Sequence, residues 1–263
     1  MTKTTILGIL NLTPDSFSGD GMQYSSQKAI EKLDRFIADG AGGIDIGAES
    51  TRPGATLLSP DEEWARLEPV IKEAAARIDK VQFSIDTRHS ETAKRFLHSF
   101  PKPKASSLYL NDVSSHKSDT MINLVKEYGA NLIMMHSLTV PADPKTTIPG
   151  NENAVETVFD WAQELIKNYG KDIIIDPGIG FGKTAEQSFA ILKNISWLQS
   201  LGARVMVGHS RKSFLSLFTD KKAEERDPET LLLSHYLAVK KVDYLRVHDV
   251  KSHVSMLKIK EAL

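Results

Sequence analysis

The sequence predicts an α/β protein, a (β/α)8 TIM barrel in a single domain that spans residues 1–263. Eight short apolar runs, rich in β-branched and aliphatic residues, are bounded by Gly, Pro, Asn or Ser, as strands commonly are. Helical patterns lie between these runs, and about 250 residues of such alternation is typical of this barrel. Each run also ends in a polar residue, at the edge where such barrels place their active sites.

The runs that we expect to form strands share a length of six to nine residues and a polar end, and they cover residues 6–12, 43–50, 81–87, 108–113, 131–136, 173–178, 204–212 and 244–250. Any single polar end has an ordinary explanation. Asp45 could cap a loop, His136 could be a satisfied core histidine, and Arg246 could pair with Asp249. Eight polar strand ends in series favour a binding site instead.

Seven segments between the strands carry helical patterns: residues 25–40, 59–78, 90–100, 119–129, 154–170, 185–202 and 227–241. The first places Ile30, Leu33 and Phe36 at helical spacing and closes on Gly40, a common helix C-terminal residue. The second has Ser59 in a capping position and a proline and acidic residues in its first turn, which favours a helix start there.

Composition limits the function classes. With 41% apolar residues the chain can bury one large core, and no linker-like segment divides it. A formal charge of −1 offers no basic footprint for nucleic acid, and no apolar run reaches membrane-spanning length. The absence of cysteine excludes disulfides and thiolate chemistry. The amino terminus does not look like a signal peptide, so we expect a cytoplasmic protein that binds neither nucleic acid nor membrane.

The segment at 173–184, IIIDPGIGFGKT, is the most distinctive. A strand ends in Asp176, and the glycines that follow allow a ligand to lie against bare backbone. The tail resembles a nucleotide-binding phosphate loop, but Pro177 stands where that motif requires its first glycine. The plain alternative is a glycine-rich turn with a solvated Lys183.

Carboxylates and amides at strand ends suit a flat heterocycle with adjacent donors and acceptors. Asp176 can accept two N–H bonds, and the amide of Asn111 can both donate and accept. A ring of this kind would lie across the carboxyl ends of the strands.

Cationic groups at other loops suit an oxyanion such as phosphate. Arg52, Arg246 and His248 can supply charge-assisted hydrogen bonds, and Asn11 offers a hard oxygen that could reach Mg²⁺. Arg246 and His248 alternate with Val247, so we expect both to point to the same side of their strand. The expected ligand therefore has an aromatic end and an anionic end.

The chain resembles the dihydropteroate synthases, pterin-binding enzymes of folate biosynthesis. The combination of motifs is more specific than any one of them: GILNLTPDSFS at 8–18, DIGAESTRPGA at 45–55, SIDT at 84–87, NDVS at 111–114, DPGIGFGKT at 176–184, SRKSF at 210–214 and RVHDV at 246–250. The resemblance implies a transferase that joins 6-hydroxymethyl-7,8-dihydropterin diphosphate to 4-aminobenzoate and releases pyrophosphate with the help of Mg²⁺. It also implies a sulfonamide target and a homodimer formed through barrel helices.

The resemblance also assigns residues to the parts of the site. Those that would hold the pterin are Asp86, Asn111, Asp176 and Lys212, and those that would hold the diphosphate are Asn11, Arg52, Arg246 and His248. Those that would line the 4-aminobenzoate pocket are Phe17, Thr51, Pro53, Phe181, Lys212 and Ser213. Asn11 would contact the metal, and the catalytic residues would be Arg52, Lys212, Arg246 and His248. The loops at 13–18 and 50–55 would close over the site.

Some positions depart from the family pattern. Ala48 stands where a second glycine is usual, the loop at 137–153 lacks the usual continuation, and His209 is uncommon before Ser210. We assign that loop no role and interpret His209 as structural. Two alternatives remain: a methyltetrahydrofolate:corrinoid methyltransferase, which shares the pterin-holding Asn and Asp, and a non-catalytic pterin-binding or scaffold protein.

Overall fold

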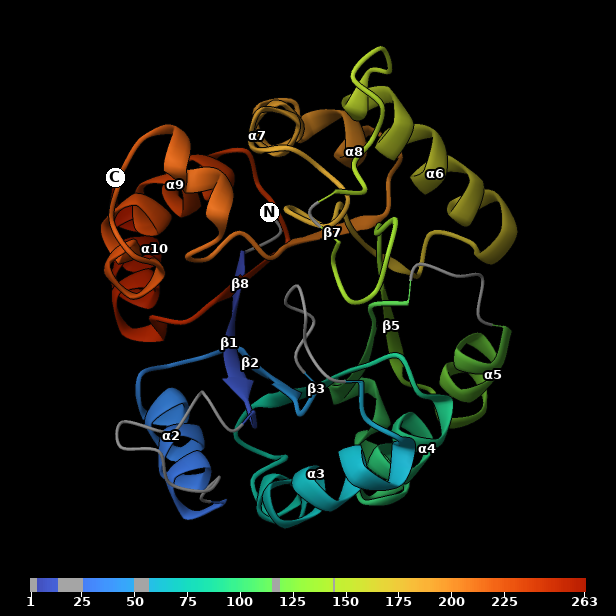
Figure 1. The fold of residues 1–263 in the computed structure, drawn as a ribbon. Coiled ribbons are helices and arrows are strands. Elements are labelled where there is room, and N and C mark those ends of the chain that lie inside the picture. Colours follow the sequence, from blue (N-terminus) through green and yellow to red (C-terminus); the bar gives the residue numbers. More distant parts are fainter. Residues whose placement is uncertain (1–3, 14–25, 50–56, 115–118, 144) are drawn as a thin grey trace.

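The computed structural model describes residues 4–13, 26–49, 57–114, 119–143 and 145–263. Eight parallel strands form a closed barrel in chain order, with helices around the outside (Figure 1). The strands are β1 (Thr5–Asn11), β2 (Gly43–Gly47), β3 (Gln82–Thr87), β4 (Leu108–Asp112), β5 (Asn131–Met135), β6 (Ile174–Asp176), β7 (Arg204–Val207) and β8 (Tyr244–Val247). Because β1 pairs with both β2 and β8, the sheet closes on itself, which confirms the predicted fold class.

The helices are α2 (Ser26–Ala38), α3 (Pro60–Ala75), α4 (Ser90–His98), α5 (Asp119–Tyr128), α6 (Ala154–Tyr169), α7 (Ala185–Lys193), α8 (Ser196–Ser200), α9 (Asp227–Val239) and α10 (Val250–Ala262). Short 3-10 turns add η1 (Lys102–Ser107), η2 (Ser213–Leu217) and η3 (Ala223–Glu225). All seven helical patterns are confirmed, with one difference. The pattern at 185–202 is two helices, because the chain leaves α7 at Asn194, whose side chain bonds the Ala190 carbonyl.

The last helix, α10, was not among the expected patterns. Its buried positions are Val250, His253, Met256 and Leu257, which lie on one face at helical spacing. His253 occupies a core position that an apolar residue would normally fill, and this weakens the apolar period in the sequence.

Local chemistry explains several helix starts. Ser59 and Glu62 form a capping box at α3, as the sequence predicts for Ser59, and Thr184 and Gln187 form another at α7. In the latter case the cap ends the glycine-rich turn after β6, so the helix start is fixed directly beside the site.

Alternation along the strands divides the barrel interior into two halves. One half is an apolar layer made of Leu7, Tyr109, Ile133, Ile174, Met206 and Tyr244. Two residues further along three of these strands, the inward positions become Asn111, Asp176 and Arg246. The interior is therefore apolar toward the strand starts and polar toward the strand ends.

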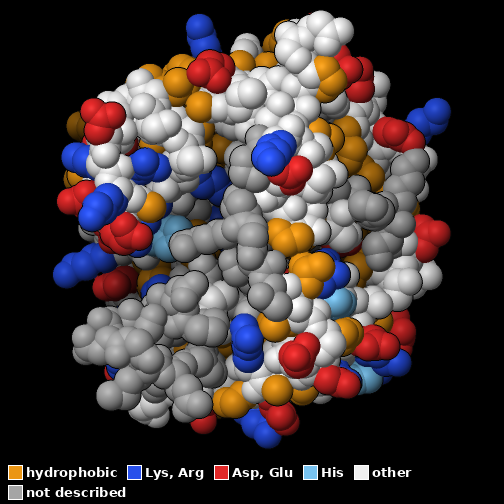
Figure 2. Space-filling model, viewed as in Figure 1, with side chains coloured by type: hydrophobic (Ala, Val, Ile, Leu, Met, Phe, Trp, Pro, Cys, Tyr) orange, Lys and Arg blue, Asp and Glu red, His pale blue; other side chains and the backbone are white. Residues whose placement is uncertain are grey.

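The large core fills the space between the sheet and the helices, with Phe83, Phe96 and Leu67 among its fully buried members. On the face shown in Figure 2, basic and acidic side chains are interspersed, as the near-zero net charge predicts. Within the described part of the chain, every helix is too short or too polar to cross a membrane.

Candidate active site

The polar half of the barrel interior brings together residues from β2, β3, β4, β6 and β8. Asp45, Asn111 and Asp176 are each less than 5% exposed. They are deeply buried because parallel strands direct every second side chain into the barrel, where the closed sheet excludes water. Buried carboxylates require charged or hydrogen-bonding partners, and those partners define the site.

Arg246 at the end of β8 is the centre of this group. Its Nε bonds Asp45, its Nη2 bonds Asp86, and Asn111 donates to the same Asp45 oxygen at 3.2 Å. Burial acts to lower the pKa of Arg246, but the charges of Asp45 and Asp86 outweigh it and raise that pKa. Burial raises the pKa of Asp86, while the Arg246 guanidinium opposes this effect.

This geometry decides two open interpretations. Arg246 pairs with Asp45 and Asp86, whereas Asp249 caps α10 by accepting from the Ser252 amide. Asp45 is an inward-facing member of the site and not a loop cap. The sequence signal for it was available, because Asp45 lies at an alternate position of a strand whose neighbours are apolar.

Lys212 and Asp176 form a second part of the site. Lys212 Nζ donates to the Ile179 carbonyl and lies 4.6 Å from the centre of the Phe181 ring. Asp176 Oδ1 accepts from the Gly178 amide at 2.8 Å. Burial lowers the pKa of Lys212 to about 8, an effect that the Asp176 charge opposes. Lys212, which the resemblance assigns to both the pterin and the 4-aminobenzoate residues, thus lies beside Phe181 of the latter group.

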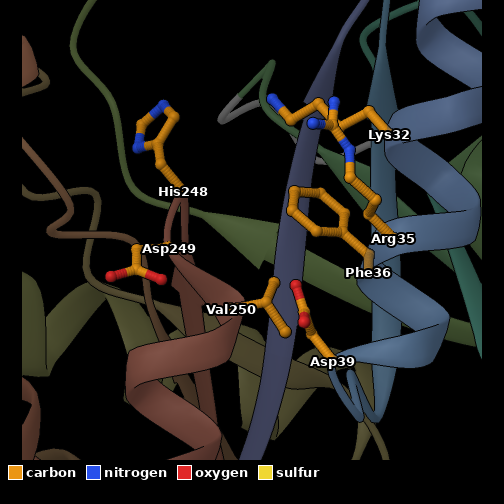
Figure 3. A pocket seen from close by; sticks show the side chains of 7 residues that line it. All are labelled: Lys32, Arg35, Phe36, Asp39, His248, Asp249 and Val250. Carbon is orange, nitrogen blue, oxygen red and sulfur yellow. The ribbon is translucent and has the colours of Figure 1, made fainter.

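His248 lies one residue beyond β8, where the chain turns toward α10. Its Nδ1 is 2.9 Å from Ser210 Oγ, and its backbone amide donates to the same oxygen. The imidazole borders a hollow of about 240 Å³ between α2 and the start of α10. Figure 3 shows Lys32, Arg35 and His248 extending toward one end of this hollow, with Phe36 and Val250 at the other. Asp39 and Asp249 also line the hollow, so it carries side chains of both charges.

The remaining predicted residues are placed as follows. Asn11 ends β1, and Ser213 begins η2 with its side chain exposed. Phe17, Thr51, Arg52 and Pro53 lie outside the described residues. The segment that holds the last three is tied at its described ends by Glu49, which accepts from the Leu58 amide and pairs with Arg88. That tie was not anticipated from the sequence.

The donor set allows only a particular kind of metal site. Among the described residues no three His, Asp or Glu side chains gather in a way that could hold an ion. Asp45 and Asp86 both bond Arg246, which leaves Asn11 as the hard oxygen at the end of β1. Mg²⁺ commonly takes few protein ligands and completes its shell with water and substrate phosphates. A Mg²⁺ ion at the end of β1 would therefore take the Asn11 oxygen and complete its shell with water and the oxygens of an anionic ligand.

His136 and His209, which are not among the site residues predicted from the sequence, are both buried. His136 packs its ring edge-on against Trp161, and its Nδ1 contacts Lys183. His209 is 0% exposed and its Nε2 lies 2.8 Å from Ser234 Oγ, which agrees with a structural role. Lys183 is itself buried, so the alternative of a solvated lysine is wrong.

Comparison with known proteins identifies the family. A family model described as pterin binding enzyme matches residues 7–248. The dihydropteroate synthase of Streptococcus pyogenes serotype M6 is 38% identical over 265 residues, 98% of this chain and 94% of that protein. The chain also spans 58% of the length of the folate synthesis bifunctional protein of Chlamydia caviae, to which it is 34% identical.

Solved structures agree with the sequence relatives. The crystal structure of dihydropteroate synthase from Anaplasma phagocytophilum with bound 6-hydroxymethylpterin-monophosphate has a TM-score of 0.86 and 36% identity, covering 100% of this chain and 99% of that one. The enzyme from Thermus thermophilus in complex with 4-aminobenzoate has a TM-score of 0.82 and 31% identity, covering 99% and 95%. With a family model that matches most of its length, this chain belongs to the pterin-binding enzyme family.

Proposed function

We propose that this chain is a dihydropteroate synthase, a transferase of folate biosynthesis that joins 6-hydroxymethyl-7,8-dihydropterin diphosphate to 4-aminobenzoate. The observation that carries the proposal is the polar ring in the barrel interior, where Asp45, Asp86, Asn111, Asp176 and Arg246 converge beside Lys212. The names of the relatives support it.

The pterin end would lie among Asp86, Asn111, Asp176 and Lys212. Asp176 has one oxygen engaged by Gly178, and its other oxygen has no hydrogen-bond partner among the described residues. A pyrimidine edge with two N–H donors suits such a carboxylate. Asn111 has a buried amide oxygen without a partner in the same part of the chain, which a ring donor could satisfy.

The diphosphate end would lie toward Asn11, Arg246 and His248, together with Arg52 outside the described residues. Lys32, Arg35 and Arg246 would supply positive charge, although Asp45 and Asp86 offset that of Arg246, and Asn11 would contribute an oxygen to Mg²⁺. Bound there, Mg²⁺ would neutralise charge on the departing pyrophosphate.

The arylamine end would lie beside Phe181, Lys212 and Ser213, with Phe17, Thr51 and Pro53 outside the described residues. The nitrogen lone pair of 4-aminobenzoate forms a bond to the pterin methylene carbon as the carbon–oxygen bond breaks. The bonding electrons leave with pyrophosphate, and the new amine loses one proton. Arg52, Lys212, Arg246 and His248 would act by stabilising the charge on the leaving group. The arylamine is a neutral nucleophile, so no strong general base is required.

Release of pyrophosphate tests the proposal. Purified protein with the pterin diphosphate and Mg²⁺ should release pyrophosphate rapidly only when 4-aminobenzoate is added, and 7,8-dihydropteroate should form in equal amount. Arg246→Met is the matched variant, because it removes the guanidinium and keeps much of the side-chain length. If the wild type bound the pterin without turnover, a non-catalytic pterin-binding protein would be favoured. Methyl transfer to a corrinoid would favour the methyltetrahydrofolate:corrinoid methyltransferase.

A homodimer and a cytoplasmic location complete the proposal. Leu232 and Val239 on α9 and Ile259 on the neighbouring α10 are exposed, and Leu232 is 74% exposed. Apolar side chains of this size on neighbouring elements suit burial against a second copy. Sedimentation should report twice the chain mass, and Leu232→Glu should shift it toward the monomer.

A cysteine-free chain suits the cytoplasm, which fractionation would test.

A further inference from the structure

Lys183 is a buried amine that the proposed chemistry does not use, and burial lowers its pKa to about 7. It lies at the end of the glycine-rich turn between β6 and α7, and it is 7% exposed. A buried ammonium group is strongly unfavourable unless its three hydrogens find acceptors. The acceptors that Lys183 finds show what it holds in place.

Three close acceptors from two neighbouring loops surround Lys183 Nζ, and the His136 carbonyl oxygen lies further away at 3.4 Å. The Phe181 carbonyl lies at 2.8 Å, the Gly178 carbonyl at 3.0 Å and His136 Nδ1 at 2.8 Å. When the Lys183 ammonium group donates to Nδ1, that ring nitrogen carries no hydrogen, and His136 is then neutral and protonated on Nε2. Burial and the Lys183 charge lower the pKa of His136 to about 3, which agrees with this assignment. Lys183 therefore ties the turn after β6 to the end of β5.

The turn requires such a tie. Gly178, Gly180 and Gly182 all have positive φ angles, of 62°, 79° and 65°. Three glycines in so short a turn give the unfolded chain large conformational freedom, which must be lost when one conformation is fixed. Gly178 also lies so close to His136 that an added Cβ would be 1.8 Å from the His136 carbonyl oxygen.

The same turn positions two side chains of the site. The Ile179 carbonyl accepts from Lys212 Nζ, and the Phe181 ring lies beneath that ammonium group. The carbonyls that Lys183 holds belong to Gly178, which directly precedes Ile179, and to Phe181, which follows it by two residues. If the turn relaxed, Phe181 and the anchor of Lys212 would move together.

We propose that Lys183 is a positioning residue for the arylamine site. It fixes the turn that carries Phe181 and the Lys212 anchor, and it does not itself touch a substrate. The inference rests on the proposed function, because the ligand of Phe181 is taken to be 4-aminobenzoate. Asp86, Asn111 and Asp176 lie on strands, so the pterin contacts should depend less on Lys183, although the turn supplies the Gly178 amide to Asp176.

Lys183→Met tests this assignment, since methionine keeps the length of the side chain and removes its donors. Calorimetry should show 4-aminobenzoate binding, with pyrophosphate, pterin and Mg²⁺ present, weakened about tenfold or more, the factor that 1.4 kcal/mol gives. Binding of the pterin diphosphate should weaken by a clearly smaller factor, because Lys212 depends on the turn but Asp86, Asn111 and Asp176 lie on strands. The control is Tyr244→Phe, which removes a hydroxyl contact to Arg204 at the opposite end of the barrel. It should reduce stability without changing either affinity.

His136→Phe provides a second variant if Lys183→Met does not fold. It keeps a ring against Trp161 and removes one acceptor, so it should weaken 4-aminobenzoate in the same direction by a smaller factor. Equal losses for both ligands, or an unchanged arylamine affinity in folded Lys183→Met, would overturn the proposal. If the wild-type protein bound neither ligand, the proposed function itself would be wrong. That outcome is distinct from failure of the Lys183 proposal, in which the wild type binds both ligands.

Discussion

Asp176 shows how one side chain can serve the fold and a ligand at once. Its Oδ1 accepts from the Gly178 amide and shapes the turn. Its Oδ2 faces the space beside Gly208, where even an added Cβ would stay 3.7 Å away. Burial raises the pKa of Asp176, and the Lys212 charge opposes that effect.

Asp176→Asn should separate the two roles. An amide oxygen can still accept from Gly178, but an amide nitrogen would replace the oxygen that faces the ligand. We expect pterin binding to weaken by about 1.5–3 kcal/mol, the value of a hydrogen bond to a charged group. The melting temperature should stay close to that of the wild type. Asp176→Ala is the control, because it removes both the bond to the Gly178 amide and the contact with the ligand. Unchanged pterin affinity in folded Asp176→Asn would contradict the assignment.

His209 makes a second prediction at the residue scale. Burial lowers its pKa to about 3, with the neighbouring His253 acting in the same direction. At a pH below the usual pKa of 6.5, His209 is protonated in the unfolded chain but stays neutral in the folded protein. Protonation therefore favours the unfolded state, and the contribution of His209 to stability is lost as the pH falls. The buried carboxyls of Asp86 and Asp176 have raised pKa values and act in the opposite direction.

Asp86 and Asp176 are present in both the wild type and His209→Gln. Their effect on the pH dependence of stability therefore cancels when the two proteins are compared. Glutamine can still offer an N–H to Ser234. The stability advantage of the wild type should fall by about 1 kcal/mol between pH 6.5 and 5.5, the linkage expected for one proton. Urea unfolding at a series of pH values measures it, and His235→Gln on the exposed side of α9 is the control. A constant difference across that range would show that His209 is accessible to protons.

At the scale of elements, a polar chain joins β7, α9 and α10. His253 Nδ1 donates to the Asp249 carbonyl, so its Nε2 must accept from the Ser234 hydroxyl. Ser234 Oγ in turn accepts from His209 Nε2. This order of donors holds the start of α10 against the end of β7, where Ser210 supports His248.

Ser234→Ala should break this junction. It leaves two buried imidazole nitrogens without partners, which costs about 1–3 kcal/mol of unfolding free energy for each stranded group. Ser255→Ala removes a hydroxyl contact on the exposed side of α10 and should change stability by less than about 0.5 kcal/mol. Thermal unfolding measures both. Equal stabilities for the two variants would mean that water satisfies the histidines.

At the scale of the whole molecule, the two halves of the barrel interior have separate tasks. The apolar layer fills the end where the strands start, and the polar ring occupies the end where they finish. In such barrels the starting end contributes to stability, while the finishing end contributes the chemistry.

Leu7→Ala tests this division. Leu7 is 1% exposed in the apolar layer, so its truncation should cost about 2–5 kcal/mol of unfolding free energy. The affinity for the pterin diphosphate at a temperature where the variant is folded should not change. Leu7→Met is the volume-conserving control and should cost less than about 1.5 kcal/mol. A large loss of affinity in Leu7→Ala would show that the two halves are coupled.

Much of this molecule could be predicted from the sequence. Strands and helices follow from short-range periodicity, and eight alternations leave few other folds to consider. The inward positions of Asp86, Asn111 and Asp176 follow from their place at strand ends. The break between α7 and α8 and the helix α10 were less accessible, because Asn194 and His253 interrupt patterns that are otherwise apolar.

Tertiary structure alone decided which charges meet. Asp45 and Arg246 are 201 positions apart, and no local pattern shows that the guanidinium reaches β2 and β3 and not Asp249 three residues away. Lys183 looks solvated in a glycine-rich turn, yet His136 from the neighbouring strand covers it. Closure and register of the barrel set these partners. A sequence determines which side of a strand each residue faces, whereas its partner across the interior depends on every other strand being in place.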